Sequence, residues 1–154
     1  MNVNRIIKKG GETKMYTLLQ HVVRFARKHS DDPGTKVGAC LVVNGKHTFG
    51  TNRFYALPEG KTKEETLANR DLKLAYITHA EVDAIANSSC TVGGTLYVNY
   101  IPCDKCAARI AAAGIVKVVA IDHSDEVDLI ARWNKYWVIG RQILHDSGVE
   151  LSEV

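Results

Sequence analysis

Apolar residues near the start of the chain recur at the spacing of a helix. They stand at i, i+3, i+4 and i+7 positions: Met15, Leu18, Leu19, Val22, Val23 and Ala26. A helix with this spacing carries its apolar side chains on one face, which packs against the rest of the protein. The run Asp-Asp-Pro-Gly at 31–34 then stops the helix. The pattern therefore predicts an amphipathic helix as the first element after residue 14.

Beyond residue 36 the pattern alternates between strands and helices. Residues 37–43 predict a strand, Asn44-Gly45 a two-residue hairpin turn and 47–51 the returning strand. Further strands are expected at 95–99, 116–121 and 149–151, and helices at 78–87, 102–113 and 126–147. The segment 53–77 is the least regular, with a helical stretch expected at 64–74. A hairpin followed by β-α-β-α units predicts an α/β protein with helices packed over one sheet.

Length and composition limit the class of protein. The chain has 154 residues, of which 45% are hydrophobic and 24% charged. These values are typical of a soluble globular domain and exclude a disordered chain, a coiled-coil rod or a low-complexity array. A chain of this length usually forms one domain, since domains run to about 100–200 residues. We expect a flexible polar lead at 1–14 and a single domain at 15–154.

Charge and hydropathy narrow the partners and the compartment. Lysine and arginine number 20 and acidic residues 17, so the net charge of +3 is too weak to indicate a nucleic-acid platform. No apolar run reaches the roughly 18–20 residues of a membrane span, and the polar N-terminus lacks the core of a signal peptide. We therefore expect a cytoplasmic protein with no membrane partner and no stable nucleic-acid partner.

Two short segments contain residue types that bind metals: 78–81 (Thr-His-Ala-Glu) and 102–106 (Pro-Cys-Asp-Lys-Cys). Cys103 and Cys106 are three residues apart, so on a helix they share a face and can chelate one ion. If they lie in the first helical turn, the helix dipole favours their thiolates. With His79 they make a ligand set that suits Zn²⁺.

Three protein ligands leave a fourth tetrahedral position open, which is the number typical of catalytic zinc. His79 and Glu81 can both reach a metal that sits off a helix start. Glu81 then need not bind the metal, and it can carry protons between water and a substrate. The sequence therefore predicts a catalytic zinc site with His79, Cys103 and Cys106 as ligands and Glu81 as the proton carrier.

Each part of this pattern has a simpler interpretation when it is taken alone. A single C-x-x-C also occurs in redox pairs and in half of a structural zinc site, but the sequence holds no second C-x-x-C. The joint pattern is far more specific than its parts. Cys40, inside an apolar strand, is expected to be inert core, and Cys90 receives no role. The other histidines are expected at the surface: His21, His29, His47, His123 and His145.

From about residue 15 to residue 151 the chain resembles the deoxycytidylate (dCMP) deaminases of the zinc-dependent cytidine deaminase superfamily. The H-A-E and P-C-x-x-C motifs are typical of the superfamily. The run Asp-Pro-Gly-Thr-Lys-Val-Gly-Ala at 32–39 and the long segment before His79 favour the dCMP branch. Gly50-Thr51-Asn52 matches the family's G-x-N motif, whereas Asp83 stands where the family often has asparagine.

The resemblance implies a three-layer α/β/α fold, cytidine-deaminase-like, with a central five-stranded mixed sheet. It implies hydrolytic deamination of dCMP to dUMP and ammonia with Zn²⁺ as cofactor, supplying dUMP for thymidylate synthesis. By the same resemblance Asn52 contacts the nucleotide sugar and the backbone of Ala80 contacts the pyrimidine. Such deaminases are usually homo-oligomers, often hexamers.

A monophosphate substrate needs cations or hydrogen-bond donors near the mouth of the pocket. The candidates lie beside the motif segments: Lys36, Arg53, Arg70, Lys73 and Tyr76. Arg53 is the first choice because it follows Asn52 directly.

Two alternative functions stay open at this point. The first is another deaminase of the same fold, acting on tRNA adenosine, guanine or free cytidine. A tRNA-acting enzyme should be more basic than this chain. The second is a non-catalytic interaction module with structural zinc, although a closed zinc site gains nothing from Glu81.

Overall fold

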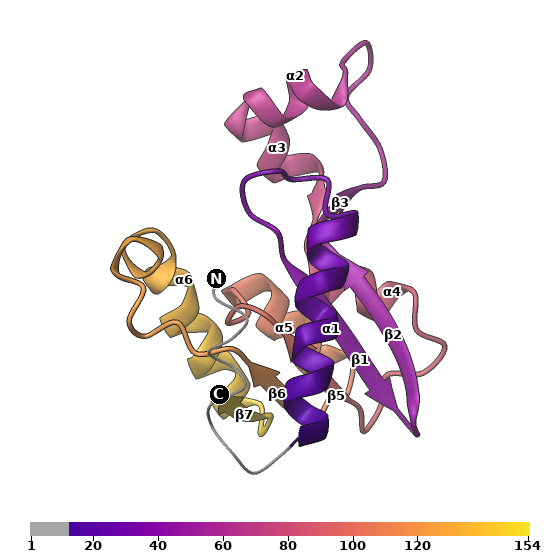
Figure 1. The fold of residues 1–154 in the computed structure, drawn as a ribbon, viewed down its shortest axis with the longest axis vertical. Helices are drawn as coiled ribbons and strands as arrows, with labels where there is room; N and C mark the ends of the chain where they lie inside the picture. The colour runs from indigo at the N-terminus through magenta and orange to yellow at the C-terminus, as the bar shows by residue number, and fades with distance from the viewer. Residues whose placement is uncertain (1–12) are drawn as a thin grey trace.

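A computed structural model describes residues 13–154, and helices and strands alternate along them (Figure 1). The helices are α1 (Thr13–His29), α2 (Lys63–Ala68), α3 (Arg70–Tyr76), α4 (Ala80–Ala86), α5 (Asp104–Ala112) and α6 (Val127–Asp146). The strands are β1 (Gly38–Val43), β2 (Lys46–Thr51), β3 (Arg53–Phe54), β4 (Ile77–Thr78), β5 (Thr95–Val98), β6 (Lys117–Ala120) and β7 (Glu150–Glu153). Of the lead expected at 1–14, residues 1–12 lie outside the described part, and the last two residues begin α1.

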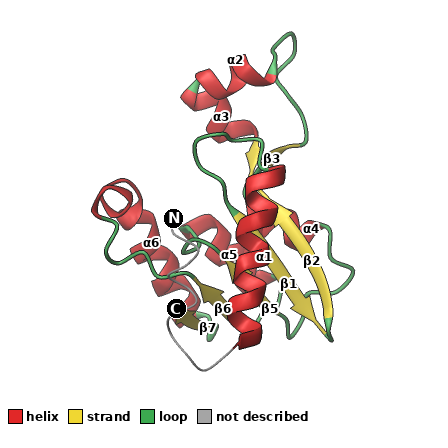
Figure 2. Ribbon diagram, viewed as in Figure 1, coloured by secondary structure: helices red, strands yellow, loops and turns green. Residues whose placement is uncertain are grey.

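The main sheet is five-stranded and mixed, as expected, with the strand order β2-β1-β5-β6-β7 (Figure 2). Strand β1 is antiparallel to both of its neighbours, and β5, β6 and β7 are parallel to one another. The hairpin turn between β1 and β2 is also confirmed. Asn44 and Gly45 have φ angles of 49° and 76°, the left-handed conformation that a two-residue turn of this kind requires.

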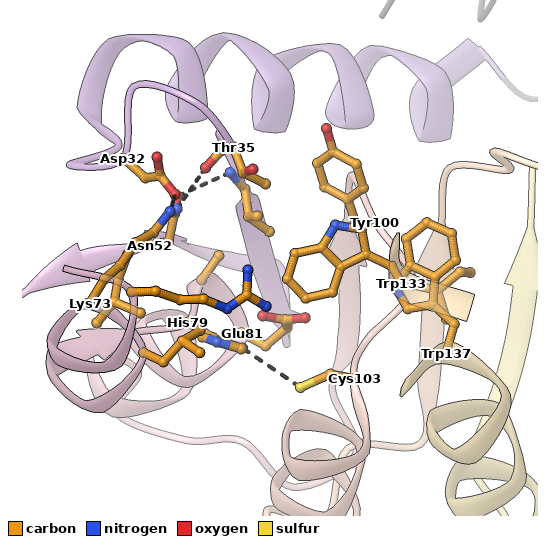
Figure 3. A pocket seen from close by; sticks show the side chains of 16 residues that line it. Asp32, Thr35, Asn52, Lys73, His79, Glu81, Tyr100, Cys103, Trp133 and Trp137 are labelled. Atoms are coloured by element: carbon orange, nitrogen blue, oxygen red, sulfur yellow. Dashed lines mark hydrogen bonds and ion pairs between the residues drawn. The ribbon is translucent and has the colours of Figure 1, made fainter. Parts of the chain in front are cut away.

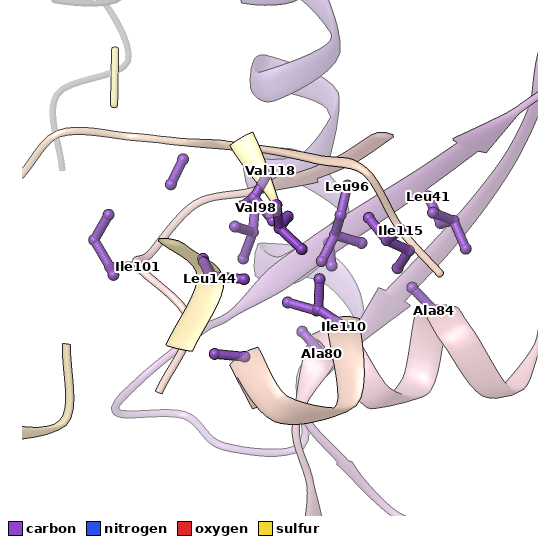
Figure 4. Close-up of a cluster of buried hydrophobic side chains, with 14 of the residues drawn as sticks. Leu41, Ala80, Ala84, Leu96, Val98, Ile101, Ile110, Ile115, Val118 and Leu144 are labelled. Atoms are coloured by element: carbon purple, nitrogen blue, oxygen red, sulfur yellow. The ribbon is translucent and has the colours of Figure 1, made fainter. Parts of the chain in front are cut away.

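Helices cover both faces of the main sheet and make the three expected layers. On one face α1 packs its Leu19 and Val23 against Val119. On the other face α4, α5 and α6 enclose the larger core, which includes Leu41, Leu96, Val98, Val118, Ala80, Ala84, Ile110 and Leu144 (Figure 4). Both faces of β1 are therefore covered, which explains why its sequence reads as a continuous apolar run. No helix within residues 13–154 is long and apolar enough to cross a membrane.

The segment 53–77 differs from the single helix expected at 64–74. It forms two short helices, α2 and α3, which meet at Asn69. The Asn69 side chain accepts a hydrogen bond from the Leu72 backbone N–H at 3.1 Å and so caps α3 at a residue where α2 has already ended. Strands β3 and β4 pair at the base of this segment, and the two helices project from the sheet as an arm (Figure 1).

Helices α4 and α5 both begin later than expected. His79 and Cys103 have extended backbones and stand at the N-caps, immediately before the first helical turns. The expectation that Pro102 and Cys103 lie within a first turn is therefore wrong, because Pro102 precedes the cap. The consequence is favourable for a metal site, since an N-cap side chain can reach past the end of its helix.

Candidate active site

The three expected metal ligands converge between the starts of α4 and α5. The Nδ1 atom of His79 lies 3.6 Å from the Sγ atom of Cys103 and 3.3 Å from that of Cys106. All three donor atoms lie within 4.8 Å of one another. Zn–S bonds of about 2.3 Å and Zn–N bonds of about 2.0–2.1 Å place tetrahedral S and N ligands about 3.5 Å apart. The spacing and the chemistry of the donors therefore fit zinc.

The electrostatics of the Cys103 thiol also suit a metal. The hydrogen bond with Cys106 lowers the pKa of the Cys103 thiol to about 4, against the opposing effect of burial, and the His79 ring adds to the lowering. Cys103 is therefore a thiolate at neutral pH, the form that binds metals. The other two cysteines lie elsewhere. Cys40 is fully buried in β1, where burial raises its pKa to about 12, and Cys90 is exposed.

Glu81 lies in the first turn of α4 and only 4% of its surface is exposed. It lines the same cavity as His79, Ala80 and Cys103. Burial raises the pKa of its carboxyl group above the ordinary value, with a partial opposing effect from the nearby His79 ring. A carboxyl group with a raised pKa beside a metal site is suited to accept a proton and return it.

The cavity above these residues has two chemically different walls (Figure 3). Its polar wall comes from the α1–β1 loop, the residue after β2 and α3: Asp32, Thr35, Asn52 and Lys73. Arg70 of α3 also lines the cavity. Its aromatic wall comes from the segment after β5 and from α6: Tyr100, Trp133 and Trp137. Glu81 and His79 lie between the walls. The arrangement can hold a flat ring and a polar group at the same time.

Asn52 holds the polar wall together. Its Oδ1 accepts hydrogen bonds from the Val37 backbone N–H at 3.0 Å and the Ser30 hydroxyl at 2.6 Å. Its Nδ2 donates to the Thr35 carbonyl at 2.7 Å. Because Nδ2 carries two N–H groups and donates one of them to Thr35, the other is left for a ligand, whereas Oδ1 already accepts from two donors. Asn52 can therefore donate to a bound hydroxyl but has little capacity to accept.

Two cations line the cavity, and they differ in their partners. The Nζ atom of Lys73 lies 2.5 Å from the Oδ2 of Asp32, a carboxylate whose side chain is only 5% exposed. Arg70 is exposed and takes part in no ion pair within residues 13–154. Arg70 is therefore the better placed of the two to bind an added anion.

Three of the expected substrate contacts do not line the cavity: Arg53, Lys36 and Tyr76. The Nε atom of Arg53 is 3.0 Å from the buried Asp83 carboxylate, in an ion pair without the alignment of a hydrogen bond. Lys36 donates to the carbonyl of Arg27 at 3.4 Å. Tyr76 ends α3 and is 38% exposed. Arg53 is therefore occupied elsewhere, although it follows Asn52 directly.

The aromatic wall was not predicted from the sequence, and one histidine that was expected at the surface is buried. Trp133 and Trp137 are four residues apart in an expected helix, a spacing that places them on one face and could have identified them. His123, expected at the surface, is only 3% exposed, whereas the other four non-ligand histidines are exposed. No local signal marks its burial, because Asn99 and Tyr100, which contact its ring, are far away in the sequence.

Comparisons with known proteins agree with this geometry. Residues 12–122 match the model of the cytidine and deoxycytidylate deaminase zinc-binding region. A probable deoxycytidylate deaminase of Caenorhabditis elegans is 29% identical over 82% of this chain and 69% of its own length. The deoxycytidylate deaminase of Homo sapiens is 34% identical over 64% of this chain and 59% of its own length. The apo dCMP deaminase of the cyanophage S-TIM5 superposes with a TM-score of 0.67 at 25% identity, covering 94% of this chain and all (100%) of that one.

Proposed function

The chain belongs to the cytidine and deoxycytidylate deaminase family, and we propose that it hydrolyses dCMP to dUMP and ammonia, supplying dUMP for thymidylate synthesis. One observation carries the proposal: the buried Glu81 lies beside the His79, Cys103 and Cys106 cluster, at a cavity with a polar and an aromatic wall. A closed structural zinc site has no use for such a cavity or for a buried carboxyl group that is not a ligand. The geometry therefore favours an enzyme over an interaction module.

Each residue has a distinct part in the proposed reaction. His79, Cys103 and Cys106 would hold the metal. When bound, zinc lowers the pKa of water to about 7 and so supplies a nucleophile at neutral pH. The Glu81 carboxylate takes a proton from the attacking water and gives it to N3 of the cytosine ring. It then takes the second proton from the hydroxyl group added at C4 and gives it to the departing amine, so that water and dCMP yield dUMP and ammonia.

The substrate contacts follow from the polar wall. The free N–H of Asn52 donates to a sugar hydroxyl, and the backbone of Ala80 contacts the pyrimidine. Arg70 binds the 5′-phosphate, and Lys73 adds positive charge that Asp32 partly neutralises. Arg53, Lys36 and Tyr76 stay outside this set because none of them lines the cavity.

Ammonia release from a panel of substrates tests the proposed function. The panel holds dCMP, CMP, deoxycytidine, dCTP, guanine and a tRNA anticodon stem-loop, each assayed with the zinc-loaded protein. We expect dCMP to have the highest kcat/KM. Fastest release from guanine or from the stem-loop would instead identify another deaminase of this fold, and no release from any substrate would favour a structural zinc module.

We also propose that the protein is a homo-oligomer. Helix α3 buries none of its residues and α2 buries only Thr66. The arm nevertheless exposes apolar side chains, with Leu74 at 53% and Leu57 at 39%. A second copy of the chain would cover this surface. A fully active species that is strictly monomeric by light scattering would contradict the proposal.

A cytoplasmic location is proposed on the state of the cysteines. All four are free: Cys40, Cys90, Cys103 and Cys106. Free thiols fit a reducing compartment, where thiolate metal sites persist. Cell fractionation tests this, and recovery of the protein outside the cytoplasmic fraction would contradict it.

A further inference from the structure

His123 is a buried histidine that the proposed reaction does not use. It follows β6, and its side chain is only 2% exposed. Its Nδ1 atom lies 2.7 Å from Oε1 of Glu126, and its Nε2 atom lies 2.7 Å from the backbone oxygen of Asn99. Both ring nitrogens therefore face oxygen atoms at hydrogen-bond distance.

These two partners determine the protonation of the ring. A backbone carbonyl can only accept a hydrogen bond, and so can an ionised carboxylate. The Glu126 side chain is 41% exposed, so water can solvate its carboxylate form. Beside that carboxylate form and the Asn99 carbonyl, both ring nitrogens can donate only as an imidazolium. A neutral ring would leave one nitrogen lone pair facing an oxygen lone pair.

The ring of His123 also contacts the aromatic wall of the cavity. It stacks on Tyr100 with centroids 4.8 Å apart and an angle of 13° between the planes. On Trp137 the centroids are 6.2 Å apart and the angle is 27°. Tyr100 and Trp137 both line the cavity (Figure 3). A cation stacked on aromatic rings is held by their electron-rich faces as well as by its hydrogen bonds.

Asn99, the residue before Tyr100, accepts from His123 through its backbone carbonyl, and its side chain is held by the start of β1. Its Nδ2 donates to the Lys36 carbonyl at 3.0 Å, and its Oδ1 accepts from the Gly38 N–H at 2.8 Å. The hydrogen bond from His123 to the Asn99 carbonyl completes this attachment. The backbone that carries Tyr100 is thus held between the start of β1 and His123.

We propose that His123 is a positioning residue whose imidazolium ring joins Glu126 to the Asn99 carbonyl and so holds Tyr100 and Trp137 in the wall that receives the substrate's base. The effect on catalysis rests on the proposed function. The state of the ring does not depend on it, because hydrogen bonds within the free protein determine that state.

Three variants distinguish two roles of His123: linking Glu126 to the Asn99 carbonyl as an imidazolium, and merely filling space beside the aromatic wall. His123→Phe keeps a stacking ring but has no hydrogen bond. Glu126→Gln keeps a side chain of similar shape beside Nδ1 but removes the charge that favours the imidazolium, and its amide N–H can donate to a neutral ring. Asp128→Asn is the matched control, because it removes a carboxylate from the first turn of α6, two residues after the N-cap Glu126, and Asp128 forms no ion pair with His123 within residues 13–154. Glu126 and Asp128 are partly or fully exposed, so these variants are expected to fold.

Nitrogen-15 spectra of the histidine rings at neutral pH test the link directly, with the His123 signals identified by their loss in His123→Phe. We expect two protonated ring nitrogens in the wild type and in Asp128→Asn, and a neutral ring in Glu126→Gln. A neutral His123 ring in the wild-type protein would overturn the proposal, whatever the enzyme's activity.

Steady-state kinetics with dCMP then test the positioning role, with zinc content measured in each variant. We expect His123→Phe and Glu126→Gln to raise KM by about 10-fold with a smaller change in kcat and unchanged zinc, because a displaced wall weakens binding more than chemistry. Unchanged KM in both variants would refute the positioning role. If the wild type deaminates none of the six substrates, the proposed function fails. The ring spectra still show whether His123 forms the imidazolium link.

Discussion

The Nε atom of Arg53 lies 3.0 Å from the Oδ2 of Asp83, a fully buried carboxylate on the helix that carries Glu81. Asp83 also accepts hydrogen bonds from the Thr51 N–H at 2.9 Å, from the Asn87 Nδ2 at 3.0 Å and from the Tyr55 hydroxyl. Asp83 therefore connects the end of β2, next to Asn52, to helix α4, which also carries Glu81. Arg53 balances the charge of this buried group.

Replacing Arg53 should lower the stability of the fold and leave the binding of the substrate's phosphate unchanged. We expect Arg53→Ala to lower the free energy of unfolding by about 1–3 kcal/mol, since Asp83 loses its cation but keeps three other donors. KM for dCMP and for deoxycytidine should shift together. Chemical denaturation and kinetics with both substrates check this.

A second substitution provides the control for Arg53. Asp83→Asn in the Arg53→Ala background should restore part of the stability, because an amide oxygen still accepts from Thr51 and no buried charge is left unpaired. If Arg53→Ala instead raised KM for dCMP alone, Arg53 would be a phosphate contact.

Arg70 is the residue whose loss should weaken phosphate binding. We expect Arg70→Ala to raise KM for dCMP by about 10–100-fold, as when a charged hydrogen bond of about 1.5–3 kcal/mol is lost. Deoxycytidine, which has no phosphate, should be almost unaffected. The matched control is Lys46→Ala, which removes a cation from the far hairpin. Equal weakening for both substrates would show that Arg70 supports the fold and does not bind the phosphate.

Features encoded locally were predictable from the sequence, whereas features decided by distant partners were not. Asn44-Gly45 gives the hairpin because both residues adopt positive φ. The convergence of His79, Cys103 and Cys106 was predictable because they lie in two short motifs. The ion pair of Arg53 was not predictable because its partner, Asp83, reaches it only through the fold.

His123 and Asn69 illustrate the same limit. The burial of His123 depends on Asn99, which lies on the neighbouring strand's end rather than nearby in the chain. The break between α2 and α3 rests on the Asn69 cap, which competes with continuation of a helix through a segment of mixed charge. The pattern of hydrophobic positions reveals neither a single helix cap nor a hydrogen bond between residues far apart in the sequence.

Gly140 permits helix α6 to lie against the metal-binding loop. A Cβ atom at this position would come within 2.1 Å of the Pro102 backbone oxygen. We expect Gly140→Ala to destabilise the protein by about 1–3 kcal/mol or more and to weaken zinc binding, because the backbone beside Cys103 must move. Thermal unfolding and zinc titration measure both effects. Asn134→Ala, on an exposed position of α6, should change neither, and normal zinc affinity in Gly140→Ala would contradict the prediction.

Zinc affinity should rise with pH. In the metal-free protein the hydrogen bond that His79 donates to the Cys103 thiolate raises the pKa of His79, and the hydrogen bond that Cys106 donates to the same thiolate raises the pKa of Cys106. Both groups therefore hold protons near neutral pH, and zinc must displace them. We expect binding to release about one to two protons and to weaken as the pH falls. Calorimetry in two buffers of different ionisation enthalpy counts these protons.

Cysteine variants provide the control for the zinc measurement. Cys103→Ala and Cys106→Ala should lose the metal and part of the stability, whereas Cys90→Ala, at an exposed position, should keep both. Full zinc occupancy in a protein that lacks both Cys103 and Cys106 would refute the assigned site.

The most direct test of the account is the source of the oxygen in the product. Zinc-loaded protein and its Glu81→Gln variant are incubated with dCMP in ¹⁸O-water, and the nucleotide is analysed by mass spectrometry. We predict dUMP carrying one ¹⁸O atom at C4 from the wild type. In Glu81→Gln the turnover should be at least about 10²–10⁴-fold slower at unchanged zinc content. Unlabelled dUMP, or full turnover in Glu81→Gln, would contradict hydrolytic deamination with Glu81 as the proton carrier.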